Sequence, residues 1–169
     1  MSAMVVESLV KTYVCVRDME RSVEFYVRLG LEIAYRNPER SRTFLWVNAA
    51  HRQQITLWLP SAARPFCQQH VAFGVELNRV RAAKAWLEQN GIAPFADFGK
   101  APIEPIVHNW IPAASFSFND LDGNHLEFFA PLEGEPIPDD RLPPKEQQPL
   151  YLSDWEELRR DLDGVVRPP

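Results

Sequence analysis

"VKTYVCVRDMERSVEFYVRLGLE", residues 10–32, decides the fold of the first half of the chain. Its first residues alternate between apolar and polar and are rich in β-branched and aromatic types, which predicts a half-buried strand. Asp18 then precedes apolar residues at helical spacing and predicts a helix N-cap. Gly30 supplies a left-handed stop for that helix. The stretch therefore predicts a strand, a helix and a sharp turn back.

This order continues and then repeats along the chain. Three strand-like runs follow the first helix, at residues 31–37, 41–49 and 53–60. "HVAFGVELNRVRAAKAWLEQNGI", residues 70–92, then predicts a second strand and a helix that is capped by Asn78 and ends at Asn90 and Gly91. Strands at residues 94–99, 113–120 and 124–131 complete the second copy, the last two joined by an Asp-Gly turn at 122 and 123. The sequence predicts an α+β domain, residues 9–131, of two βαβββ modules at 9–60 and 68–131.

Residues 132–169 differ in character from this domain. Prolines are frequent among charged residues up to position 149, which predicts an extended arm. "SDWEELRRDLDG", residues 153–164, then predicts a short helix with a capping box from Ser153 to Glu156. A helix this short is marginal alone. We expect it to dock either on its own chain or on a partner subunit.

Composition restricts the class of protein. The 169 residues are 46% hydrophobic, enough to bury a core, and carry a formal net charge of −5, which disfavours a nucleic acid partner. The N-terminus does not resemble a signal peptide, and the longest apolar runs are too short to cross a membrane, so we expect a cytoplasmic protein. Cys15 and Cys67 lack the spacing of a metal or redox motif and are expected to be reduced thiols.

Three stretches together resemble the vicinal oxygen chelate superfamily, which includes glyoxalase I and the bleomycin and fosfomycin resistance proteins, and also the extradiol dioxygenases. They are "VKTYVCVRDMERSVEFYVRLGLE", "HVAFGVEL" and "FNDLDGNHLEFFAP". The resemblance implies two βαβββ modules whose strands wrap into an open cup, a small-molecule ligand, and a homodimer. It also implies metal ligands on the first and last strands of each module.

Carried over by this resemblance, the four ligand positions fall on Lys11, Trp58, His70 and Glu127. A protonated lysine has no lone pair and repels a cation, and a tryptophan cannot ligate. His70 and Glu127 remain as metal ligands, so the sequence indicates an incomplete site for a divalent metal such as iron, manganese, zinc or nickel. On this ground the purified protein is expected to hold less than one equivalent of metal.

Two histidines could complete the set. Side chains two residues apart on a strand share a face, so His125 is expected to point to the same side as Glu127. Two imidazoles and a carboxylate form an open triad for iron, manganese or zinc. His108 is a second candidate, whereas His51 lies in a polar turn and is expected to be solvated.

Lys11 offers a different explanation of the retained glutamate. Its ammonium could pair with Glu127 and satisfy that carboxylate without a metal, and the two could then act as catalytic acid and base. Aromatic residues and histidines around them are expected to bind the substrate: Tyr13, Trp46, Trp58, His108, Trp110 and His125. Phe95 is a further aromatic residue that could line the cup.

Two functions follow and stay open at this stage. One is a small-molecule-binding protein with an aromatic cup and no metal, or a metal-free acid/base catalyst. The other is a metal-dependent lyase, isomerase, thiol transferase or dioxygenase whose substrate carries two adjacent oxygens. The lysine at position 11 favours the first.

Overall fold

The computed structural model describes residues 6–165. Its contacts divide the chain into two compact units, the first formed by residues up to 70 with 120–125 and the second by 71–119 with 126 onward. The α+β fold expected from the sequence is confirmed, with one open sheet of four strands and one of five. No helix among the described residues is long and apolar enough to span a bilayer.

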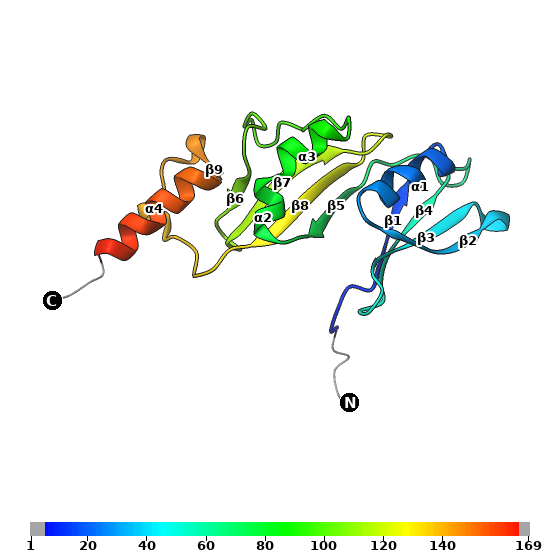
Figure 1. The fold of residues 1–169 in the computed structure, drawn as a ribbon, viewed down its shortest axis with the longest axis horizontal. Coiled ribbons are helices and arrows are strands. Elements are labelled where there is room, and N and C mark those ends of the chain that lie inside the picture. Colours follow the sequence, from blue (N-terminus) through cyan, green and yellow to red (C-terminus); the bar gives the residue numbers. More distant parts are fainter. Residues whose placement is uncertain (1–5, 166–169) are drawn as a thin grey trace. The chain divides into compact units, whose positions relative to one another are not determined.

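The four-stranded sheet has the order β1-β4-β3-β2, with β1 (Lys11–Cys15) parallel to β4 (Gln53–Trp58). β3 (Arg42–Asn48) runs antiparallel to both β4 and β2 (Glu32–Asn37). Helix α1 (Met19–Arg28) connects β1 to β2 and contacts β3 and β4 (Figure 1). Asp18 caps it as expected, because its carboxylate accepts a hydrogen bond from the amide of Arg21 at 3.1 Å. A short 3-10 turn, η1 (Pro38–Arg40), links β2 to β3.

The five-stranded sheet has the order β5-β8-β7-β6-β9. β5 (His70–Gly74), β6 (Ile106–His108), β7 (Ala113–Asn119) and β8 (His125–Pro131) are the strands of the second module. Helices α2 (Leu77–Arg81) and α3 (Ala83–Gln89) lie over β7 and β8 (Figure 1), where Trp86 makes an edge contact with Phe128, with the ring centres 6.0 Å apart.

Two details of the second module differ from the prediction. Residues 94–99 form no strand and contribute only isolated bridges, one from Pro94 and one from Asp97. The second strand of the module is β6 instead, and it contains His108. Helix α2 also begins one residue before Asn78, with Glu76 at its N-cap and no side-chain capping bond.

The C-terminal segment packs on its own chain. It contains the 3-10 turns η2 (Asp139–Arg141) and η3 (Lys145–Gln147), the strand β9 (Leu150–Tyr151) and the helix α4 (Leu152–Val165). β9 pairs antiparallel with β6, so the arm extends the sheet, and α4 follows directly (Figure 1). The predicted capping box is wrong: α4 begins at Leu152, and the hydroxyl of Ser153 donates to Glu104 at 2.7 Å.

Candidate functional site: a His-His-Glu cluster beside an aromatic cavity

His70, His125 and Glu127 come together on neighbouring strands of the five-stranded sheet. Each offers one ligand atom, and these atoms lie within 4.8 Å of one another. The imidazole rings of His70 and His125 stack with their centres 4.2 Å apart and their planes 12° from parallel. His70 is exposed, His125 half-buried, and Glu127 only 5% exposed. The alternation of β8 therefore produces the cluster expected from residues 125 and 127.

The donor chemistry of this cluster fits a divalent transition metal. Two neutral imidazoles and one carboxylate suit iron, manganese or zinc and leave coordination positions for a substrate. The spacing of the three ligand atoms, all within 4.8 Å of one another, fits a shared ion. A buried carboxylate such as that of Glu127 needs a cation, a proton or hydrogen bonds, because an unpaired charge is costly away from water.

His108, on β6, lies close to Glu127, on β8, with β7 between the two strands in the sheet. Its Nε2 atom is 3.8 Å from Oε2 of Glu127 and hydrogen-bonds with the hydroxyl of Ser115 at 2.9 Å. Its ring stacks on Phe129, with centres 5.8 Å apart. His108 is therefore held beside the cluster and is not one of its three members.

The turn before β8 fixes the start of that strand. Asp120 is buried and accepts hydrogen bonds from the amides of Asp122 and Asn124 at 2.9 and 2.8 Å, and from the hydroxyl of Tyr26 at 2.9 Å. The side chain of Asn124 in turn donates to the carbonyl of Cys15 at 2.9 Å. This network sets where His125 enters the sheet.

The predicted residues of the first module share one face of the four-stranded sheet. In the strand register, Lys11 on β1 lies opposite Gln54 on β4, and Gln54 lies opposite Trp46 on β3. Tyr13 lies opposite Thr56, two residues farther along both strands. Residues two apart on a strand point to the same side. That face carries all four predicted site residues of the module: Lys11, Tyr13, Trp46 and Trp58.

Lys11 is exposed on this face. Its ammonium lies 5.4 Å from the ring centre of Tyr13 and 5.8 Å from that of Phe44. Its pairing with Glu127 stays a prediction. His51 is exposed in the turn before β4, as expected.

A cavity of about 500 Å³ opens on the same face, where Tyr13 and Trp58 line it together with two arginines, Arg42 and Arg64. The guanidinium of Arg64 lies 5.9 Å from the ring centre of Trp58. Sequence reasoning found the two aromatic residues and missed the arginines. Arg42 lies beside Trp58 because the two residues are paired across β3 and β4. No local sequence pattern predicts that pairing.

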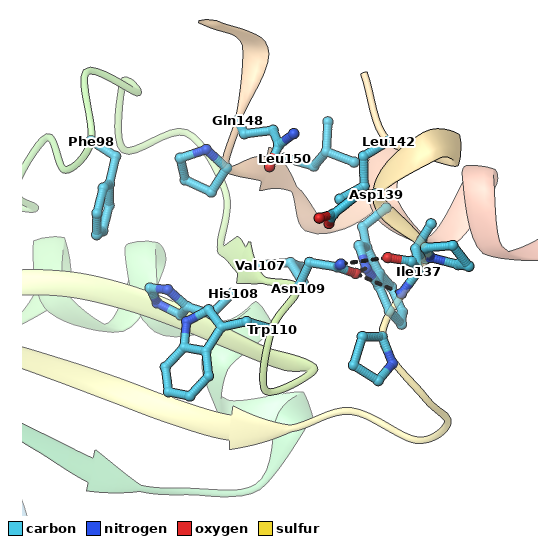
Figure 2. Close-up of a pocket in the computed structure, with 14 residues that line it drawn as sticks. Phe98, Val107, His108, Asn109, Trp110, Ile137, Asp139, Leu142, Gln148 and Leu150 are labelled. Carbon is cyan, nitrogen blue, oxygen red and sulfur yellow. Dashed lines mark hydrogen bonds between the residues drawn. The ribbon is translucent and has the colours of Figure 1, made fainter. Parts of the chain in front are cut away.

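The second unit contains a cavity of about 490 Å³ that His108 and Trp110 line, together with Phe98 and residues of the C-terminal arm (Figure 2). Trp110 was expected to bind substrate and is 77% exposed at the turn between β6 and β7. Phe95 is outside the residues that line this cavity.

The sequence model of the glyoxalase/bleomycin resistance protein/dioxygenase superfamily matches residues 8–128. The chain belongs to this superfamily. A solved structure of an integron cassette protein, HFX_CASS4, from the mobile metagenome of the Halifax Harbour sewage outfall is similar at 28% identity and a TM-score of 0.61, over 74% of this chain and 99% of that one.

Two more distant structures share the superfamily fold. A glyoxalase/bleomycin resistance protein/dioxygenase from Nocardioides is 22% identical with a TM-score of 0.57, over 80% of this chain and 91% of that one. Lactoylglutathione lyase from Agrobacterium tumefaciens is 20% identical with a TM-score of 0.56, over 74% of this chain and 94% of that one. A search of curated proteins gave no match. Residues 129–169 lie beyond the part that the superfamily model matches.

Proposed function

We propose that this superfamily member binds one divalent transition metal on His70, His125 and Glu127 and acts on a small substrate with two adjacent oxygens. The observation that carries the proposal is the approach of the three ligand atoms to within 4.8 Å. Lys11 and Trp58, at two of the four family ligand positions, favour a metal-free site. His125 changes that balance because it supplies the third donor from within β8.

The protein residues have distinct parts in this proposal. A divalent ion held by these three residues would supply Lewis-acid chemistry toward substrate oxygens. Glu127 contributes the negative charge that balances the ion, and its burial excludes water from around its carboxylate. His108 lies 3.8 Å from that carboxylate and is held by Ser115, so it is a positioning residue for Glu127.

Calorimetric titration of EDTA-treated protein with zinc and with manganese tests the metal site. We expect about one equivalent to bind the parent protein, and His70→Ala, His125→Ala and Glu127→Ala each to abolish stoichiometric binding. His108→Ala should weaken it by about 10 to 100-fold, as for residues that orient ligands. His51→Ala is the matched control, because His51 is exposed in a turn. Equal metal affinity in the parent and the His125→Ala variant would refute the proposal.

A further inference from the structure

The C-terminal arm forms one side of the 490 Å³ cavity in the second unit. Phe98, His108 and Trp110 lie on the opposite side, and Asp139, Leu142 and Gln148 face them from the arm (Figure 2). The volume falls within the range of about 300–1,000 Å³ that is common for small-molecule sites. The arm lies beyond residue 128, where the match to the superfamily model ends, so the family match does not cover this wall.

Asn109 fixes the arm to the sheet. Its side-chain amide donates to the carbonyl of Ile137 at 2.8 Å and its oxygen accepts from the amide of the same residue at 2.9 Å (Figure 2). The indole N–H of Trp155 also donates to that oxygen, at 3.2 Å. Ile137, Leu152 and Trp155 are buried, at 1%, 1% and 4% exposure. The wall is therefore anchored by both packing and hydrogen bonds.

The lining favours a flat, apolar ring. Phe98 and Trp110 are 61% and 77% exposed, and they offer ring surface that a ligand would cover. Prolines 136, 138 and 149 contribute rigid, apolar surface. Asp139 is the only Asp, Glu, Lys or Arg among the residues that line the cavity, and its carboxylate disfavours an anionic ligand.

His108 connects this cavity to the proposed metal site. Its ring lines the cavity and makes an edge contact with Phe98, with centres 5.8 Å apart, while its Nε2 atom approaches Glu127. A ligand that contacts His108 in the cavity is thus one side chain away from the glutamate.

We infer that residues 136–155 complete a binding site for a flat, uncharged aromatic molecule. Its assignment as the substrate site rests on the proposed function, whereas the binding of the ring itself does not. Figure 2 shows the arrangement on which this depends, with the aromatic side chains and the anchored arm on opposite sides of one cavity.

Titration of the metal-free protein with 2-naphthol, followed by calorimetry, tests the site. We expect saturable binding to one site, a loss of about 10-fold or more in affinity for Trp110→Ala, and little change for the control Tyr35→Ala, which removes an exposed aromatic residue from β2. The anionic analogue 2-naphthoate should bind more weakly than 2-naphthol, and Asp139→Asn should narrow that difference. Absence of 2-naphthol binding, or equal losses in the Trp110→Ala and Tyr35→Ala variants, would overturn the inference.

The His125→Ala variant separates the two proposals. It should lose the metal and keep its affinity for 2-naphthol, whereas Trp110→Ala should keep the metal and lose 2-naphthol. Binding of 2-naphthol by a protein that takes up no metal would support the aromatic site and refute the metal site. Metal uptake without 2-naphthol binding would support the metal site and refute the aromatic site.

Discussion

The hydroxyl of Tyr26 on α1 donates a hydrogen bond to Asp120 at 2.9 Å, and both side chains are buried. Asp120 also organises the turn that precedes His125, through the amides of Asp122 and Asn124. The bond thus links the first helix to the start of the strand that carries two of the proposed metal ligands. Loss of the Tyr26–Asp120 hydrogen bond should lower the free energy of unfolding, and loss of the Asp120 carboxylate should lower it more.

Tyr26→Phe should lower the free energy of unfolding by about 1 kcal/mol, the usual value for one internal hydrogen bond. Asp120→Ala removes an acceptor used by several donors and should cost about 2–3 kcal/mol, because buried donors are then left unsatisfied. Urea unfolding of the two variants measures both values. Equal costs would show that the turn does not depend on the carboxylate.

The same tyrosine predicts a pH dependence. Burial raises the pKa of Tyr26 well above its ordinary value, and the nearby charge of Asp120 raises it further. The phenol of the unfolded chain ionises near pH 10, whereas the folded one keeps its proton. The stabilisation from Tyr26 is therefore complete below about pH 10 and decreases above it. The stability difference between the parent and Tyr26→Phe should shrink as the pH rises from 9 to 11.

The two cysteines should differ in reactivity. Both are free thiols, Cys15 buried and Cys67 exposed. Burial raises the pKa of the Cys15 thiol, so less reactive thiolate is present at neutral pH. Titration of the native protein with a thiol reagent should modify one cysteine rapidly, and mass spectrometry should place it at Cys67. Cys15 should react only in denaturant; rapid labelling of Cys15 in the native protein would contradict this.

Most of the fold could be predicted from the sequence because its signals are local. Alternation, the Asp18 cap and the Asp-Gly turn each act over a few residues, and β1, α1 and β8 lie close to where these signals predict them. The strand expected at 94–99 does not continue past the Pro94 bridge, because Phe98 and Gly99 have positive φ of 48° and 73°. Pairing passes instead to Ile106–His108, which contains two β-branched residues.

The candidate site was predictable only in part. The family resemblance indicated His70 and Glu127, and strand alternation added His125 on the same face as Glu127; the structure brings the three side chains together. The approach of His108 to Glu127 and the anchoring of the arm by Asn109 depend on long-range contacts that no local pattern encodes. The same is true of Ser153, whose hydroxyl bonds Glu104 instead of capping its own helix.

We expect a homodimer, because superfamily members commonly form dimers and exposed strand edges need protection. β2 ends the four-stranded sheet, and Ile33 and Tyr35 on it are 46% and 60% exposed. Sedimentation at micromolar concentration should show a species of twice 19.4 kDa. Ile33→Lys should shift it toward monomer, because a charge at a sheet edge opposes pairing. A parent protein that sediments only as a monomer would count against the dimer.

Lys11 provides the last prediction, because the resemblance assigns it the first metal-ligand position. If the lysine lies near the metal site, its positive charge weakens binding of a divalent cation. Lys11→Met should then tighten zinc binding modestly by removing that charge. Lys11→His should tighten it further, by about 10-fold or more, because an imidazole adds a fourth donor. The titration used for the ligand variants measures both, with Lys84→Met as a control for the loss of a lysine charge that is paired with Glu88 on α3. Zinc affinities equal to that of the parent in both Lys11 variants would mean that Lys11 lies outside the metal site and that its exposed ammonium only packs over Tyr13 and Phe44.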